Sequence, residues 1–209
     1  MINVGLIGHG RYGKKYYKIL SKDKNFRIIK ILRKSKKKGN SLFTDDKKIF
    51  FKINNIDVYI IASSTNSHYE YLKTALIKKK HIIIEKPLVS NLKEFEKIKK
   101  VIKKSKKIIL MNHTDLNMNA YLNLKTAISK IGKIKFVKLI YGKIDVYPVE
   151  NIKNIYQLPH FEWLSHPLAI IIDLFKDQNF EVKVNENRKI YRKKLYQNLN
   201  ILFLGKKIN

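Results

Sequence analysis

The sequence has no cysteine, which excludes disulfide bonds and thiolate chemistry. It also has no run of about 18 consecutive apolar residues, so no membrane-spanning helix is expected. The chain begins at once on a short apolar segment, a pattern that leaves no room for a signal peptide. These absences favour a cytoplasmic protein that does not enter a membrane.

Arginine is scarce in a chain that is strongly basic. The formal net charge is +29, yet only five of the 45 basic residues are arginine. Arginine is the preferred residue for bidentate contacts to bases and phosphates, so a lysine excess is weak support for nucleic-acid recognition. The lysines accompany abundant Ile and Asn, which also have A/T-rich codons, and we interpret them mostly as solvated surface residues. No specific nucleic-acid partner is predicted, and a polyanion-binding basic protein is the weakest of our hypotheses.

The remaining composition is that of a folded protein, because hydrophobic residues make up 44% of the 209 residues. In the first half of the chain, short apolar runs alternate with segments of helical periodicity. The predicted strands are Ile2–Ile7, Phe26–Leu32, Val58–Ala62, His81–Glu85 and Ile108–Met111. The predicted helices are Arg11–Leu20, Asp45–Phe51, His68–Lys79 and Asn91–Lys104, the last capped by Ser90 or Asn91. This alternation predicts an α/β fold, with a doubly wound parallel sheet of the Rossmann type over residues 1–115.

Residues 116–209 have a different character, with longer helical segments and strands that come late. The predicted helices are Asn117–Lys130 and Glu162–Phe175, and the predicted strands are Lys133–Tyr141, Phe180–Val184, Lys189–Tyr196 and Leu199–Leu204. The last three strands have the spacing of hairpins. We therefore predict a second domain, a shortened α+β domain with an open sheet.

Three glycines lie between the first apolar run and the first amphipathic segment. Gly-x-Gly-x-x-Gly in that position is the arrangement in which backbone N–H groups and a helix N-terminus receive a dinucleotide pyrophosphate. The first glycine permits a tight turn, the second lets the phosphate approach, and the third lets helix and strand pack closely. An ordinary glycine-rich turn is the alternative. The predicted cofactor-binding residues of this turn are Gly8, His9, Gly10, Arg11, Tyr12 and Gly13.

Three further stretches join this turn in a recognisable order: Ala62–His68, Glu85–Pro87 and Glu162–His166. Together the four resemble the glucose–fructose oxidoreductase / inositol dehydrogenase family (Gfo/Idh/MocA). The resemblance extends over nearly the whole chain. It implies a Rossmann domain followed by an open α/β sheet domain, and an NAD(P)-dependent dehydrogenase acting on a sugar or polyol.

The resemblance implies roles for two loops. Ser63, Asn66 and His68 fall in a loop that lies along the cofactor in the family, although a turn before a capped helix explains them equally well. Glu85 and Lys86 follow an apolar run at the carboxyl end of a predicted strand, where ligands bind in open α/β sheets. The family uses this lysine to hold the reacting hydroxyl and the nicotinamide ribose. A lysine there would stabilise charge on the substrate oxygen; a solvated surface lysine is the alternative.

His166 is the candidate general acid–base. Glu162 lies one helical turn earlier and would orient the imidazole and tune its pKa. The family pattern here is Asp-x-Gly-x-His-x-x-Asp, and this chain has Glu162, Leu164 and Ala169 at the first, second and last defined positions around the histidine. The alternative is a helix-capping histidine next to Pro167. Lys86, His166 and Glu162 are thus the predicted catalytic residues, and no metal ligands are predicted.

The cofactor prediction depends on the residue that ends the second strand. NAD enzymes place an acidic residue there for the ribose 2′-OH. This chain has Arg33, one of its five arginines, which would pair with a 2′-phosphate. We therefore predict NADP, with NAD as the alternative.

Taken together, these residues predict an NAD(P)-dependent oxidoreductase that transfers a hydride to or from a secondary alcohol or ketone of a sugar-like substrate. Only 43 residues follow His166, so the second sheet is expected to lack several strands, which would leave its edges exposed or require a partner to cover them. A homo-oligomer is therefore expected. The alternative hypothesis is a catalytically impaired, cofactor-binding subunit or sensor, to which the departures at Leu164 and Ala169 point.

Overall fold

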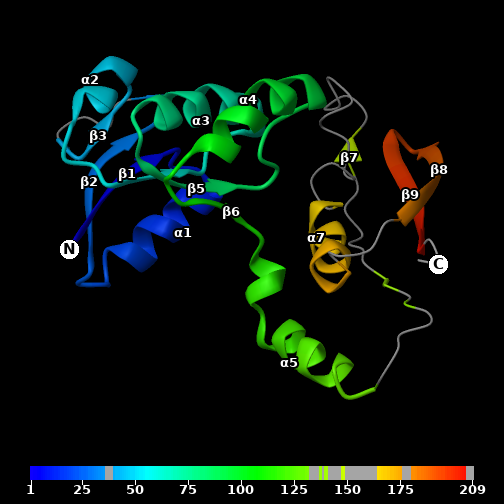
Figure 1. Cartoon of the computed structure of the whole chain (residues 1–209). Coiled ribbons are helices and arrows are strands. Elements are labelled where there is room, and N and C mark those ends of the chain that lie inside the picture. The colour runs from blue at the N-terminus through cyan, green and yellow to red at the C-terminus, as the bar shows by residue number, and fades with distance from the viewer. Residues whose placement is uncertain are drawn as a thin grey trace. The chain divides into compact units, whose positions relative to one another are not determined.

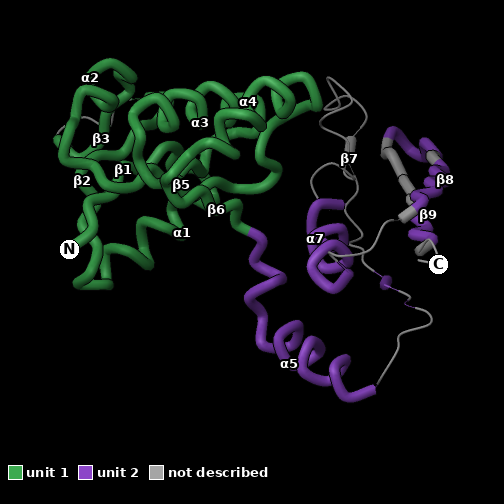
Figure 2. The backbone as a smooth tube through the Cα atoms, in the orientation of Figure 1, with its two compact units in different colours: residues 1–112 green, residues 113–209 purple. Residues whose placement is uncertain are grey.

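The computed structural model describes residues 1–35, 40–131, 137, 139–140, 147–148, 164–175 and 180–205. The chain divides into two compact units, residues 1–112 and residues 113–209, which are drawn in green and purple in Figure 2. We call them unit 1 and unit 2 and describe each by itself.

Unit 1 is built on a parallel sheet whose strand order is β3-β2-β1-β4-β5-β6. The strands are β1 (Ile2–Ile7), β2 (Phe26–Leu32), β3 (Phe43–Thr44), β4 (Val58–Ile61), β5 (His81–Glu85) and β6 (Ile109–Asn112). This order is that of a Rossmann fold, so the predicted doubly wound sheet is confirmed. The order reverses between β1 and β4, which makes the carboxyl ends of these two strands the expected ligand-binding edge. β3 was not predicted, because two residues are too short to form an apolar run.

Both faces of this sheet are covered by helices. The helices of unit 1 are α1 (Arg11–Leu20), α2 (Lys47–Lys52), α3 (His68–Ile77) and α4 (Leu92–Lys104). Since neighbouring residues of a strand point to opposite faces, Tyr59 and Ile61 of β4 pack in one core and Val58 and Ile60 in the other. The first core includes side chains of α3 and α4 and the second includes side chains of α1, and Figure 1 shows these helices on opposite sides of the sheet.

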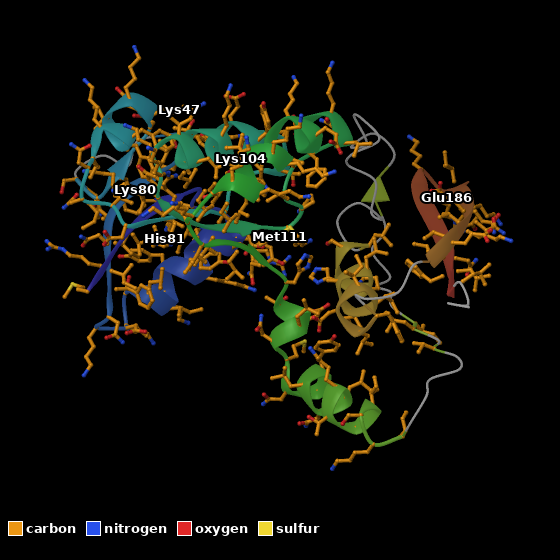
Figure 3. All side chains as sticks on the ribbon, viewed as in Figure 1. Lys47, Lys80, His81, Lys104, Met111 and Glu186 are labelled. Carbon is orange, nitrogen blue, oxygen red and sulfur yellow. The ribbon has the colours of Figure 1, made fainter. Side chains whose placement is uncertain are left out.

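Surface lysines account for much of the basic charge of unit 1. Lys47 in α2 and Lys104 at the end of α4 are exposed, and Figure 3 shows such long side chains extending outward from the helices. The helix caps follow the sequence. Asn91 accepts a hydrogen bond from the N–H of Glu94 (3.0 Å), and Glu94 accepts one from the N–H of Ser90 (3.0 Å), so the predicted start of α4 is confirmed.

Unit 2 contains helices and an antiparallel sheet. Its described elements are the 3-10 helix η2 (Thr114–Asn117), α5 (Asn119–Ile128), α7 (Ser165–Leu174), and the strands β7 (Tyr147–Pro148), β8 (Phe180–Tyr191) and β9 (Lys194–Gly205), in the order β7-β9-β8. The predicted strand Lys133–Tyr141 lies almost wholly outside the described residues.

The prediction of three short strands at the end of the chain was wrong. β8 and β9 form one long hairpin whose turn, Arg192 and Lys193, has positive φ at both residues. Residues 185–188, which separated two of the predicted strands, belong to β8, and Asn185 lies opposite Asn200 of β9 in the register of the hairpin. A polar stretch therefore lies within a strand and does not form a turn, and the actual turn lacks the glycine or asparagine that usually marks one.

Candidate active site

The glycine turn lies where the strand order reverses. Gly8 has φ of +96°, a conformation that side chains rarely adopt, and a Cβ built on it would lie 2.5 Å from the carbonyl oxygen of Ala62, the residue after β4. A Cβ on Gly13 would collide with the carbonyl of Gly8. The N–H of Gly8 donates to the carbonyl of Leu32 at 2.8 Å, which ties the turn to β2. Gly8 and Gly13 are thus required by the packing of the protein itself.

Gly10 differs from the other two glycines because a Cβ built on it would meet nothing within 4 Å. Gly10 is the N-cap of α1, where no side chain caps the helix and the first turn carries no acidic residue. The N-terminal N–H groups and the helix dipole therefore favour an anion in front of Gly10. Space that a side chain would fill, next to helix N–H groups, fits the pyrophosphate of a dinucleotide.

An aromatic and guanidinium cluster lies beside the turn. The Phe43 ring of β3 lies 5.1 Å, centroid to centroid, from the His9 ring and 5.8 Å below the guanidinium of Arg33. The N–H of Arg33 donates to the carbonyl of Thr44 at 2.9 Å, and its guanidinium reaches the Ser35 hydroxyl at 3.5 Å. The structure thus brings together His9 and Arg33 through a phenylalanine that sequence reasoning missed. Arg33 is half-buried at the end of β2.

Arg11 and Tyr12 lie on the exposed side of α1. The Arg11 guanidinium lies 5.9 Å from the centroid of the Tyr12 ring, and the Lys15 ammonium lies 5.0 Å from it. Tyr12 is 37% exposed. These two predicted residues therefore stand at the surface of the first helical turn.

The loop after β4 contains the 3-10 helix η1 (Thr65–Ser67) and leads into α3. Ser63 accepts a hydrogen bond from the Ser67 hydroxyl (2.8 Å), while the exposed Asn66 accepts one from the Ser64 hydroxyl (2.8 Å). His68 is only 1% exposed, and its two ring nitrogens face backbone carbonyls. Of the three predicted residues of this loop, Asn66 is the one that lies open to a ligand, and His68 is enclosed.

Glu85 is buried and holds two neighbouring elements together. Its Oε1 accepts hydrogen bonds from the Tyr16 hydroxyl of α1 and from Nδ2 of Asn112 at the end of β6, both at 2.8 Å. Burial, reinforced by the negative charge of Glu85, raises the pKa of Tyr16, so the tyrosine remains a donor. Lys86 comes next and is half-buried, with a cis peptide bond to Pro87. Tyr16 and Asn112 were missed because nothing in the sequence marks a tyrosine or an asparagine as the partner of a distant glutamate.

His166 of unit 2 pairs with a carboxylate that was not predicted. Its Nδ1 lies 3.0 Å from Oδ2 of Asp115 in η2, and His166 is 8% exposed. Glu162, the predicted partner, lies outside the described residues, so that prediction stays untested. Leu164 precedes α7 and Ala169 lies within it. A carboxylate at Nδ1 is the arrangement that orients an imidazole for proton transfer.

A second polar group of unit 2 connects α5 and α7. The Tyr121 hydroxyl donates to Oδ2 of Asp173 at 2.6 Å, and the Lys125 ammonium lies 2.8 Å from the same oxygen. Burial and this carboxylate raise the pKa of Tyr121. Tyr121 is 6% exposed while Asp173 is partly exposed, so the contact is a part-buried one that ties the two helices.

The described helices include none that is long and apolar enough to cross a membrane. A protein-family model described as an oxidoreductase family with an NAD-binding Rossmann fold, GFO_IDH_MocA, matches residues 2–113. This match confirms the family resemblance, and three of the four stretches lie within the matched residues, whereas Glu162–His166 lies beyond them. A search of curated proteins found no match.

Solved structures with the same fold include three whose descriptions are informative. A candidate oxidoreductase from Magnetospirillum magnetotacticum has a TM-score of 0.78 at 19% identity over 97% of this chain and 66% of its own. Biliverdin reductase from a Synechocystis species, solved with biliverdin and NADP+, has a TM-score of 0.73 at 14% identity over 98% and 70%. The myo-inositol 2-dehydrogenase of Lactobacillus plantarum has a TM-score of 0.72 at 18% identity over 90% and 59%. The chain spans less than two thirds of the first and third of these relatives.

Proposed function

The chain belongs to this oxidoreductase family with an NAD-binding Rossmann fold, and on that premise we propose that it uses NADP to oxidise or reduce a sugar-like substrate. The reaction is hydride transfer between the nicotinamide and a secondary alcohol or ketone. The observation that carries the proposal is the contrast among the three glycines. Gly8 and Gly13 are explained by packing, whereas Gly10 has open space beside uncapped N–H groups.

NADP is favoured over NAD by Arg33. The arginine directly follows β2, and the Phe43 ring beneath its guanidinium limits its orientations. A guanidinium held in this way suits a bidentate contact with a 2′-phosphate. Among the structural neighbours, the biliverdin reductase was solved with NADP+, which agrees with the proposal without assigning a cofactor to this chain.

The chain's own residues have distinct roles in this proposal. The cofactor supplies the hydride-transfer chemistry when bound. Lys86 donates a hydrogen bond to the reacting oxygen and stabilises negative charge there. His166 moves the proton, and Asp115, whose Oδ2 lies 3.0 Å from Nδ1, holds the ring in place. Glu162 remains a proposed further partner of His166. Asn66, exposed in the loop after β4, is proposed to contact the cofactor.

One observation favours a second candidate function, a cofactor-binding subunit or sensor that does not turn over substrate. Leu164 and Ala169 replace the glycine and the second aspartate of the family pattern around His166. Leucine beside the N-terminus of α7 adds bulk, and alanine removes a carboxylate. A protein of this kind would bind the cofactor but would not transfer a proton to or from a substrate.

The proposed partner is a second copy of the chain, docked through the β8–β9 hairpin. Val182, Val184 and Ile190 lie on the same face of β8, because they are separated by even numbers of residues, and each is more than half exposed. Such an apolar strand face is normally covered. Light scattering during gel filtration tests this: Val184→Lys is expected to shift an oligomer to monomer, and Lys183→Glu, on the opposite face, is not.

Cofactor binding is tested by titrating NADPH and NADH while following nicotinamide fluorescence. Gly10→Asp keeps a good N-cap but places negative charge where the pyrophosphate is expected, so affinity should fall by more than about tenfold, equivalent to 1.4 kcal/mol, with an unchanged melting temperature. Gly10→Ser is the matched uncharged control. If the wild type binds neither nucleotide, the proposal is wrong. Arg33→Ala is expected to weaken NADPH binding and to leave NADH binding unchanged.

Turnover separates the two candidate functions. A panel of sugars, sugar nucleotides and polyols is assayed with the wild type and with Lys86→Ala, which should lose activity while still binding NADPH. Turnover by the wild type on no member of a broad panel, with cofactor binding intact, would favour the sensor.

A further inference from the structure

His68 connects the loop after β4 to the loop that carries Lys86. Its Nδ1 lies 2.8 Å from the carbonyl oxygen of Pro87, and its Nε2 lies 3.1 Å from the carbonyl oxygen of Ser63. The ring is 1% exposed. An imidazole at the start of α3 therefore reaches the residue directly after Lys86, and it does so out of contact with solvent.

Lys86 is flanked by buried contacts on both sides. On the side of Glu85, the carboxylate is held by Tyr16 and Asn112, as described above. On the side of Pro87, His68 holds the peptide carbonyl. A further contact joins the same two loops, because the Ser90 hydroxyl donates to the carbonyl of Thr65 at 3.1 Å. The backbone on either side of Lys86 is thus attached to parts of unit 1 that are distant in sequence.

The two contacts of the imidazole are not equivalent. Burial lowers the pKa of His68, so the ring is neutral at neutral pH and has a single N–H to donate. We infer that this proton lies on Nδ1, because the contact from Nδ1 to the carbonyl of Pro87 is the shorter of the two. The shorter contact favours the Nδ1–H tautomer, in which Nε2 carries no proton and faces the carbonyl of Ser63.

We propose that His68 is a positioning residue for Lys86: its hydrogen bond to Pro87 fixes the peptide next to the lysine and couples it to the loop that carries Asn66. The inference deepens the proposed function, since it assumes that Lys86 contacts the reacting oxygen. His68 itself touches no substrate. The family resemblance placed it among cofactor-contacting residues, whereas its enclosure gives it an indirect role.

The test measures the chemical reactivity of Lys86 in the protein without cofactor. Lysines are acetylated at trace level, and the rate at Lys86 is compared by mass spectrometry with that at exposed Lys104 of the same molecule (Figure 3). Replacing His68 with Asn keeps a donor near the position of Nδ1, and replacing it with Gln moves the amide toward the position of Nε2. The acetylation rate of Lys86 is expected to change by about threefold to tenfold, the equivalent of one net hydrogen bond, in His68→Gln and His68→Leu. In His68→Asn the rate is expected to stay the same.

His81 provides the matched control. It begins β5, at the opposite end of the strand from Lys86, and its Nδ1 accepts a hydrogen bond from the N–H of Ile108 at 3.2 Å. His81→Gln likewise removes a ring that contacts backbone, and it should leave the Lys86 rate unchanged. Equal Lys86 rates in the wild type, His68→Gln and His68→Leu, with all three folded by circular dichroism, would overturn the proposal.

Two further measurements keep the test decisive. If the variants do not fold, two-bond proton–nitrogen spectra of the wild-type protein show which nitrogen of His68 carries the proton. A proton on Nδ1 supports the hydrogen bond to Pro87, and a proton on Nε2 contradicts it. In a turnover assay, His68→Gln should lower kcat more than it raises KM. Failure of NADPH and NADH to bind would refute the proposed function, whereas the acetylation rates need no cofactor and judge His68 alone.

Discussion

Units 1 and 2 bury their side chains in different ways. In unit 1 both faces of the parallel sheet carry apolar cores, with fully buried residues such as Tyr59, Phe50 and Leu72. Among the described residues of unit 2, the buried side chains are Tyr121 and His166, and both are held by carboxylates.

This difference predicts what each unit tolerates. The stability of unit 1 depends on close packing, so atoms added at its close contacts are expected to lower the free energy of unfolding. In the described part of unit 2 the buried side chains contact carboxylates, so loss of a polar partner is expected to lower the free energy of unfolding more there than a change of shape. Three substitutions or conditions sharpen the comparison.

The largest effect is expected from Gly13→Ala in unit 1. The added Cβ collides with the carbonyl of Gly8, a backbone group that moves only if α1 shifts from β1. The free energy of unfolding should fall by about 3 kcal/mol. Urea denaturation followed by circular dichroism measures it, and Gly10→Ala, which meets nothing within 4 Å, is the control. If Gly13→Ala and Gly10→Ala lose the same free energy of unfolding, steric fit does not distinguish the two positions and the comparison is wrong.

A smaller loss is expected from Tyr121→Phe in unit 2. The substitution removes the 2.6 Å hydrogen bond to Asp173 and leaves the carboxylate with Lys125. The cost of a bond to a charged group is about 2 kcal/mol. Hydrogen exchange should increase in α5 and α7 and stay unchanged in β1 and β4. Unchanged exchange in α5 and α7 would mean that polar contacts do not hold these helices.

The smallest effect is a pH dependence located in unit 1. Burial lowers the pKa of His68, against opposing contributions from the carbonyls of Pro87 and Ser63 and from the charge of Glu85. Between the lowered and the ordinary value the unfolded chain binds more protons, so the free energy of unfolding rises with pH there. Stability should be lost as the pH falls through the ordinary histidine value. His68→Asn should show a weaker dependence in urea melts at several pH values; an equal one would assign the effect to other groups.

Periodicity predicted the parts of the fold that are long enough to have a period. The five longer strands of unit 1 and its helices appear where apolar runs and amphipathic segments stand in the sequence. The two-residue strand β3 has no period, and it was missed. The β8–β9 hairpin was divided wrongly because the polar residues 185–188 look like a turn until their partners in β9 are known.

The candidate site divides in the same way. Motif residues such as Gly10, Arg33 and Lys86 were identified because their type and spacing carry a chemical meaning. Their supports were not, since Phe43, Tyr16 and Asp115 are ordinary residues whose roles depend on contacts across the fold. Asp115 lies 51 positions from His166 in the sequence. Only a three-dimensional arrangement identifies such partners.

The open space at Gly10 also has a consequence for how this chain changes over generations. Selection for folding acts on Gly8 and Gly13, since a side chain at either one disturbs the backbone. Folding alone places no such demand on Gly10, so only nucleotide binding would preserve a glycine there. In a lineage that abandoned its cofactor, position 10 would be the first of the three to accept other amino acids. The residue found there in descendants of this chain would then record whether the nucleotide was still in use.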